Sequence, residues 1–435
     1  MKFVRYERDT QEMKSKPHVV VLGGNFAGLT TARFIRDLCG ERVNITVIDR
    51  KPYLLFIPNI GIEVLDNRDP DETMHFDIDH FLEREGSSFI QGEVGDIDLD
   101  RKTVRFIPNE RPGSASEVIC YDYLVIALGA RLAYDKLEGF GEHGHSLSDG
   151  YYGNKLRRYL YGGNYKGGPI AIGAARFHQG TRGNPDWLPL TGAACDGPPL
   201  ETALSLAAWL EQRKLGGPKN ITLFSPADLI AEDAGEQIVN QFLAMASPMG
   251  FHYEKDTPDI KQITNDGIEF VNGKSLEAEL KIVLPDWEPH EFLKKLPIVD
   301  EVGFVVTDLY MRNPDYPQVF AVGDAAALAV PKLGSIGHKQ AEIAARQIAR
   351  DVGLLSGEKA DAPFWPEVVC FGDMGHHKAF YIHSDVWYGG KVSIFKMGHS
   401  LYAMKLAFKE MYFRTGGKVP TWGMPLAEAM AEKFL

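Results

Sequence analysis

Two cysteine thiols far apart in the chain are the residues best suited to redox chemistry. Cys195 lies in a glycine- and proline-rich loop, Ala-Ala-Cys-Asp-Gly-Pro-Pro, and Cys370 lies in Glu-Val-Val-Cys-Phe-Gly-Asp. Neither belongs to a Cys-x-x-Cys pair, which is the usual spacing of a redox-active dithiol. A joint thiol centre therefore requires the fold to bring the two residues together. Each thiol taken alone is equally compatible with a small buried hydrophobic residue.

The other cysteines and the adjacent histidines do not indicate a second redox site or a metal site. Cys39 ends an apolar helical pattern and Cys120 precedes an apolar strand pattern, so both are interpreted as packed thiols. His376 and His377 are adjacent, which points their side chains in different directions, and no ligand cluster accompanies them. We therefore predict no metal site.

A glycine-rich turn near the N-terminus predicts a nucleotide-binding unit. The sequence from His18 to Gly28 has the pattern of a buried strand, a tight turn and the start of a helix. The unpaired N–H groups at such a helix start suit a pyrophosphate. The second strand ends at Asp49, which can accept hydrogen bonds from ribose hydroxyls. The residues assigned to this site are Gly23, Gly24, Asn25, Phe26, Ala27, Gly28, Asp49 and Arg50.

This motif is degenerate, because Asn25 replaces the middle glycine, and alone it is compatible with a purely structural turn. Two later signals occur in the order typical of two-domain flavoproteins. One is the apolar strand that ends at Gly129, and the other is Val-Gly-Asp324, whose carboxyl group would accept a hydrogen bond from a ribityl chain. The ordered set predicts FAD.

The second half of the chain shows another α/β pattern without a usable NAD fingerprint. After the strand at 169–173 the sequence continues Ala-Ala-Arg-Phe-His-Gln-Gly, with bulky and charged residues where a pyrophosphate would rest. We therefore predict an α/β fold with two Rossmann-like dinucleotide-binding domains of the FAD-disulfide-reductase type, followed by an amphipathic helical membrane-anchoring region. The predicted divisions are an N-terminal arm at 1–17, an FAD domain at 18–130 and 305–360, a second domain at 131–304 and a C-terminal quinone- and membrane-binding region at 361–435.

The chain resembles the sulfide:quinone oxidoreductase family from about His18 onward. The resemblance rests on the degenerate glycine motif, Ala-Leu-Gly129, the loop cysteine Cys195, Val-Gly-Asp324, Val-Pro-Lys332 and Val-Cys370-Phe-Gly-Asp. It implies that Cys195 and Cys370 form the redox pair that takes sulfide sulfur. It also implies that Lys332 faces the pyrimidine side of the flavin, that Phe371 lines a quinone pocket and that Phe408 forms the opposite wall.

One departure from the family bears on the cofactor. Many members have a third cysteine where this chain has Ser148. A thioether to the flavin at that position is therefore not expected, and we predict non-covalent FAD.

The C-terminal segment predicts an interfacial membrane anchor. Leu401, Met404 and Phe408 belong to an apolar stripe at helical spacing, and a second apolar helix is expected at 425–435. Basic residues lie among and near the stripe: Lys391, Lys396, Lys405, Lys409, Arg414 and Lys418. The alternative is a helix pair that packs on the body or at a subunit contact, so homo-oligomerisation stays open.

Composition limits the partners. The formal net charge of −12 argues against nucleic acid, and no apolar run is long enough for a spanning helix. The charged N-terminal segment lacks the apolar core of an export signal, so we expect a monotopic protein on the cytoplasmic face of a membrane.

The function expected from these features is oxidation of sulfide to polysulfide or zero-valent sulfur, with two electrons passing through FAD to quinone. Three alternatives remain. A type II NADH:quinone oxidoreductase would need a usable second nucleotide site. The flavin subunit of a cytochrome-linked sulfide dehydrogenase would need an export signal, and a non-catalytic flavin redox sensor would not turn over.

Overall fold

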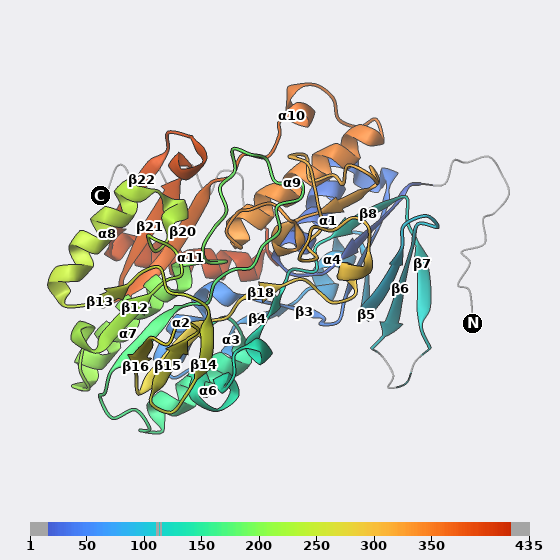
Figure 1. Cartoon of the computed structure of the whole chain (residues 1–435). Coiled ribbons are helices and arrows are strands. Elements are labelled where there is room, and N and C mark those ends of the chain that lie inside the picture. Colours follow the sequence, from blue (N-terminus) through green and yellow to red (C-terminus); the bar gives the residue numbers. More distant parts are fainter. Residues whose placement is uncertain (1–15, 110–112, 114, 419–435) are drawn as a thin grey trace, which may run out of the picture.

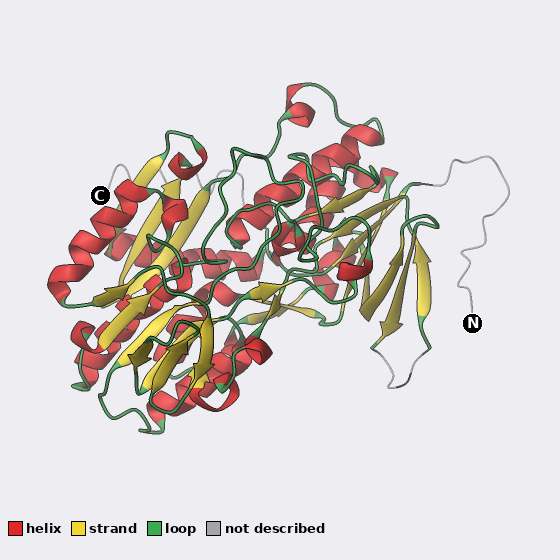
Figure 2. Cartoon of the chain, in the orientation of Figure 1, coloured by secondary structure: helices red, strands yellow, loops and turns green. Residues whose placement is uncertain are grey.

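The computed structural model describes residues 16–109, 113 and 115–418 of the 435-residue chain. Two sheets built mainly from parallel strands lie side by side, and an antiparallel sheet from the C-terminal part lies next to the second (Figure 1). Helices flank these sheets, while long loops run between them (Figure 2). The predicted α/β fold is confirmed.

The first sheet has seven strands, and five of them are parallel. The middle one of these five parallel strands is buried on both faces, as expected for a parallel strand covered by helices. The two predicted strands, one starting at His18 and one ending at Asp49, are confirmed. In spatial order the strands are β19 (Val319–Ala321), β8 (Tyr123–Ile126), β1 (His18–Leu22), β2 (Asn44–Asp49), β5 (Ser88–Asp98), β6 (Thr103–Pro108) and β7 (Glu117–Cys120).

The turn after β1 requires glycine at two positions. Gly23 has φ +100°, and a Cβ there would lie 2.2 Å from the carbonyl oxygen of Ala127 on the neighbouring strand. A Cβ on Gly28 would lie 1.8 Å from the carbonyl oxygen of Gly23. Helix α1 (Phe26–Cys39) can therefore start directly behind the strand, and it packs against α9 (Gly334–Asp351).

The second sheet has five parallel strands, in the order β10 (Gly144–His145), β17 (Leu280–Leu284), β11 (Ile170–Ala174), β12 (Ile221–Phe224) and β13 (His252–Glu254). Helices α6 (Gly150–Tyr161) and α7 (Gly197–Arg213) pack on its strands. No helix follows β11 directly. The loop 175–196 separates β11 from α7 and carries Cys195 near its end.

Shorter elements connect these units. The small strands are β3 (Tyr53–Leu55), β4 (His75–Asp77), β9 (Arg131–Leu132), β14 (Ile260–Ile263), β15 (Gly267–Phe270), β16 (Ser275–Glu277) and β18 (Trp287–Glu288). The remaining helices before the C-terminal region are α2 (Ile60–Leu65), α3 (Pro70–Thr73), α4 (Asp79–Arg84), α5 (Phe140–His143), α8 (Glu236–Met249) and α10 (Glu358–Asp361).

The C-terminal region differs from its predicted helical character, because it begins with an antiparallel sheet of β20 (Val368–Gly375), β21 (Lys378–Ser384) and β22 (Ser393–Gly398). Helix α7 packs on β20, and α11 (His399–Arg414) packs on β21. The apolar stripe of α11 faces the protein, with Leu401 and Tyr412 fully buried and Phe408 half-buried. For α11 the structure therefore matches the alternative of a helix packed on the body.

The second predicted amphipathic helix, at 425–435, lies outside the described residues. Within 16–109, 113 and 115–418, no helix combines the length and the apolar character needed to cross a bilayer.

Candidate active site

Cys195 and Cys370 converge on the start of α7. The sulfurs come from different elements, since Cys195 precedes α7 in the loop and Cys370 lies on β20, which packs along α7. A Cβ placed on Gly197 would lie 3.5 Å from Cys370 Sγ and 3.8 Å from Cys195 Sγ. Both thiols are free, Cys195 is buried and Cys370 is half-buried. The fold thus brings the two predicted residues together at one point.

Burial controls the protonation of both thiols. Burial raises the pKa of Cys195 well above its usual range, and the neighbouring Cys370 and Asp233 raise it further, whereas the backbone N–H of Gly197 lowers it. Burial likewise raises the pKa of Cys370 to about 12, against the favourable charge of Lys405. Burial therefore favours the neutral form of both free thiols.

Lys332 lies behind the Cys195 loop. Its backbone N–H donates to the carbonyl of Ala194 at 2.8 Å, so the loop and the lysine are held together. Its ammonium is buried, donates to the carbonyl of Ala326 at 3.0 Å and lies 4.7 Å from the ring centroid of Phe304. Burial lowers the pKa of Lys332 to about 8, although Asp324 and Asp300 oppose that shift.

Asp324 lies in the turn after β19, which also approaches α1. The backbone N–H of Gly323 donates to Gln340 Oε1 at 2.7 Å, and a Cβ on Gly323 would lie 2.9 Å from Ala27 Cβ. Burial raises the pKa of Asp324 to about 6, and the charge of Lys332 counteracts this. The opposite charges of Asp324 and Lys332 therefore stabilise each other without a direct ion pair in the described structure.

The turn between β1 and α1 fits a dinucleotide. Helix α1 begins at Asn25 without a side-chain cap, and Asn25 Oδ1 is buried without a hydrogen-bond partner. Asp49 Oδ2 accepts from the backbone N–H of Gly24 at 2.7 Å, which holds the carboxylate beside the glycine turn. A Cβ on Gly129 would meet nothing within 4 Å, so space adjoins this residue. Arg50 is exposed beside Asp49.

The two predicted quinone residues lie in different hydrophobic clusters. The ring of Phe371 packs on Tyr381 with a centroid distance of 4.6 Å. Phe408 instead packs 6.2 Å from Phe56 and 5.8 Å from Tyr412, in the aromatic cluster between α1 and α11. Ser148 is buried, and its backbone N–H donates to Ser146 Oγ.

The sequence interpretation missed a buried charged group beside Cys370. Lys405, only 3% exposed, donates to Glu201 Oε1 at 2.6 Å and to the carbonyl of Phe371 at 2.9 Å. Burial raises the pKa of the nearby Asp373 to about 7, Glu201 adds to this shift and Lys405 opposes it. The available signal is a lysine inside the apolar stripe of α11, a pattern that also fits a helix at a membrane interface.

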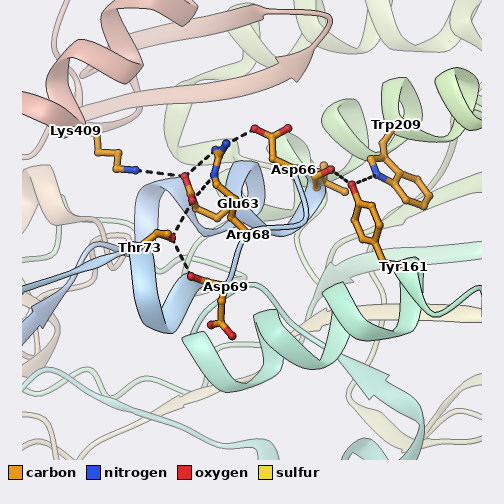
Figure 3. Close-up of polar contacts among 9 residues, drawn as sticks. Glu63, Asp66, Arg68, Asp69, Thr73, Tyr161, Trp209 and Lys409 are labelled. Carbon is orange, nitrogen blue, oxygen red and sulfur yellow. Dashed lines mark hydrogen bonds and ion pairs between the residues drawn. The ribbon is translucent and has the colours of Figure 1, made fainter.

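A second lysine of α11 is bound by the first α/β unit. Lys409 forms an ion pair with Glu63 at 3.3 Å, and Glu63 also accepts from Arg68 and Thr73 (Figure 3). In the same view, Tyr161 donates to the carbonyl of Leu65 at 2.5 Å. Because Arg414 also pairs with Glu410, all three basic residues of α11 have acidic partners.

A match to a protein-family model covers the first part of the chain. The model described as "Pyridine nucleotide-disulphide oxidoreductase" matches residues 17–165. This segment includes the glycine turn, β1, α1 and β2.

Comparisons with curated proteins and solved structures extend along most of the chain. It is 25% identical to the sulfide-quinone reductase of Aquifex aeolicus (strain VF5), over 96% of this chain and 95% of that protein. The crystal structure of the sulfide:quinone oxidoreductase from Aquifex aeolicus superposes with a TM-score of 0.76 at 23% identity, covering 95% of each chain.

NADH-oxidising quinone reductases are also similar. A type II NADH:quinone oxidoreductase of Staphylococcus aureus (strain MSSA476) is 21% identical over 88% of this chain and 93% of that protein. The structure of NDH2 from Plasmodium falciparum in complex with NADH has a TM-score of 0.65 at 12% identity, covering 92% of this chain and 96% of that one. These comparisons confirm the predicted resemblance to the sulfide:quinone oxidoreductases, and the chain is an FAD-dependent oxidoreductase.

Proposed function

We propose that this chain oxidises sulfide at Cys195 and Cys370 and passes two electrons through FAD to a quinone. One observation carries the proposal: the two sulfurs converge on Gly197 although their residues are far apart in the chain. The buried Lys332 beside the Cys195 loop supports it.

The sulfur chemistry starts from a disulfide between the two residues. Hydrosulfide attacks Cys195 Sγ, a new S–S bond forms there, and the bond to Cys370 breaks. Cys195 is left as a persulfide, and Cys370 leaves as a thiolate that keeps the electron pair. Loss of two electrons and one proton then rejoins both sulfurs as a bridge longer by one sulfur atom. Repeated turnover lengthens the bridge until it is released as polysulfide or zero-valent sulfur.

The chain's own groups stabilise the charges of this step. The backbone N–H of Gly197 and the positive end of the α7 dipole favour negative charge at Cys195, where the persulfide forms. The ammonium of Lys405 favours a thiolate at Cys370. Both effects oppose the cost of burial, and the Cys370 thiolate forms as the S–S bond breaks.

The cofactor is held by the glycine turn and by two acidic residues. The uncapped start of α1 would bind the pyrophosphate, Asp49 the ribose and Asp324 the ribityl chain. FAD supplies, when bound, the two-electron acceptor between the thiols and the quinone. Lys332 would place its positive charge at the pyrimidine end of the ring.

Quinone reduction requires two protons, and Asp373, whose pKa burial raises to about 7, can supply one of them. Lys405 Nζ bridges Glu201 and the carbonyl of Phe371, while Asp373, with its raised pKa, lies in the same charged group. We assign Phe371 and Phe408 to the quinone-binding region, where they would line separate parts of it because they lie in different hydrophobic clusters.

A lipid-dissolved acceptor favours a peripheral, monotopic position on a membrane, at the cytoplasmic face. Lys405, Lys409 and Arg414 of α11 already form ion pairs with acidic side chains of the protein, so they are not free to bind lipid headgroups. We therefore assign the membrane contact to the segment after α11.

The deciding experiment follows flavin absorbance anaerobically after addition of sulfide or of NADH to the purified holoenzyme. We expect sulfide alone to bleach the flavin and a short-chain quinone to restore it. Cys370→Ser should abolish bleaching, whereas Cys120→Ser, at an exposed thiol on β7, should not change it. Rapid bleaching by NADH without a response to sulfide would identify an NADH dehydrogenase instead.

A further inference from the structure

A second cavity lies at the opposite end of the second sheet from the thiols. It has a volume of about 450 Å³ and is lined by residues of α5, β10, α6 and the start of β17. Lys281, near the start of β17, lines it, whereas Leu284 at the end of that strand packs on Cys195. A strand rises roughly 3.3 Å per residue, so the two sites are separated by about 10 Å along β17. The volume is within the usual range for small-molecule sites.

Positive charge in this cavity lacks carboxylate partners. The ammonium of Lys281 is buried and donates to the carbonyls of Asn265 at 2.9 Å and Glu279 at 3.2 Å. Lys155 donates to backbone carbonyls, including that of Gly144 at 2.9 Å. Within the described part of the chain, neither lysine, nor Arg158 on the same face of α6, has a carboxylate within 4.0 Å.

The two acidic side chains that line the cavity form no ion pair with these cations among the described residues. Glu279 accepts from the backbone N–H groups of Lys166 at 2.5 Å and Gly168 at 2.7 Å, so its carboxylate is bound to the main chain. Glu142 is 84% exposed and lies 3.5 Å from His143. Burial lowers the pKa of Lys281, Asp266 and Glu279 oppose this shift, and the charge of Lys155 adds to it. An anion in the cavity would stabilise the charged form of Lys281 further.

The imidazole of His145 contributes to the cavity a buried nitrogen without a hydrogen-bond partner and an aromatic ring. His145 is 4% exposed, and its Nδ1 is buried without a partner. Buried polar atoms are rarely left unpaired unless a ligand or water completes them. The ring of His145 lies 4.8 Å from that of Tyr159, and the exposed Tyr151 lines the same cavity. The site therefore combines cations, a hydrogen-bonding atom and aromatic faces.

We infer that this cavity binds a small organic anion in which a phosphate or carboxylate group is attached to a planar ring. The anionic group would lie against Lys281 and Arg158, and the ring against Tyr151 and Tyr159. Adenosine 5′-monophosphate is a suitable probe of this class. The inference is independent of the proposed sulfide chemistry, because no lining residue belongs to the thiol or flavin sites.

The test is calorimetric titration of AMP into the oxidised holoenzyme with its flavin site full. We expect one AMP per chain, with adenosine and inorganic phosphate each binding much more weakly. Arg158→Gln should weaken AMP binding roughly tenfold, because a charge-assisted hydrogen bond is lost. Arg158 is exposed and its Nε bonds only its own helix at Asn154, so this variant should fold. Arg101→Gln, at an arginine 83% exposed and outside the cavity, is the matched control.

Three outcomes would overturn the inference. The first is the absence of AMP binding at millimolar concentration. The second is AMP binding that is unchanged in both Arg158→Gln and Lys281→Met. The third is phosphate binding as tightly as AMP, which would remove the planar ring from the ligand class. Flavin bleaching by sulfide provides a separate readout, so failure here is distinguishable from failure of the sulfide proposal.

Discussion

The ammonium of Lys405 lies 2.6 Å from Glu201 Oε1, so a single ion pair joins α11 to α7 beside Cys370. Removal of one partner from a buried pair leaves the other charge uncompensated and costs about 3–5 kcal/mol. We expect Lys405→Met to lower the free energy of unfolding of the holoenzyme by that amount, measured by urea titration. The double variant Glu201→Gln/Lys405→Met should recover much of the loss. Equal losses in the single and double variants would contradict the pairing.

The variant Gly197→Ala tests whether additional sulfur atoms must fit between Cys195 and Cys370 during sulfide oxidation. The added methyl group would lie at ordinary van der Waals distance from both sulfurs, 3.5 and 3.8 Å, so folding and flavin content should not change. It would fill the place where a bridging sulfur must fit, and we expect sulfide-driven flavin bleaching to slow at least about tenfold. Gly95→Ala, where a Cβ meets nothing within 4 Å, is the control. A full rate in Gly197→Ala would count against a polysulfur bridge.

The protonation of Lys332 predicts a pH dependence. Burial lowers its pKa to about 8, so its positive charge is present below that pH and is lost above it. Arginine stays charged throughout this range. In stopped-flow bleaching, the rate ratio of wild type to Lys332→Arg should be constant below about pH 8 and then fall by up to about tenfold per pH unit. Because the ionisation of sulfide affects both proteins equally, it does not change this rate ratio. A ratio that stays constant up to pH 10 would exclude a role for the positive charge of Lys332 in flavin reduction.

Glu63 predicts an acid-sensitive contribution to stability. Burial alone would raise the pKa of Glu63, but hydrogen bonds from Arg68 and Thr73 and the charge of Lys409 outweigh it, and the pKa is lowered. The folded state therefore favours the charged carboxylate, and its contribution is present at neutral pH and disappears as the pH falls through the lowered pKa. Glu63→Gln should cost about 3–5 kcal/mol at pH 7 in urea unfolding. The difference in free energy of unfolding between Glu63→Gln and wild type should disappear at acidic pH. The control Glu72→Gln, at a surface residue, should unfold with the same free energy as wild type at every pH.

Deletion of residues 419–435 tests the proposed membrane contact. We expect the shortened protein to lose binding to liposomes in a flotation assay, because the cations of α11 are already paired. Reduction of a water-soluble quinone by sulfide should be retained. Unchanged flotation would place the membrane contact on the described part of the chain.

The nucleotide turn could be predicted from the sequence because its constraints are local. Gly23 and Gly28 are required by contacts with backbone a few residues away or on the adjacent strand, and such contacts leave a recognisable spacing. The convergence of Cys195 and Cys370 has no local signature. It depends on β20 packing along α7, and only the resemblance to a family suggested it before the structure was known.

Lys405 shows why part of the site was missed. A lysine within an apolar helical stripe has the same sequence pattern whether it lies at a lipid surface or pairs with a buried acid. Its partner, Glu201, is far away in the sequence, on a helix of the second sheet. The sheet β20–β22 was missed for a related reason: its first hairpin turns at His376 and His377, both with positive φ, rather than at a typical turn sequence.

Two lysines one turn apart on α11 are bound by different halves of the molecule, Lys405 by Glu201 of the second and Lys409 by Glu63 of the first. The halves cannot rotate against each other without breaking one of these ion pairs. Helix α11 therefore holds the two halves in one relative orientation, and a domain rotation would carry the free-energy cost of separating one of these ion pairs.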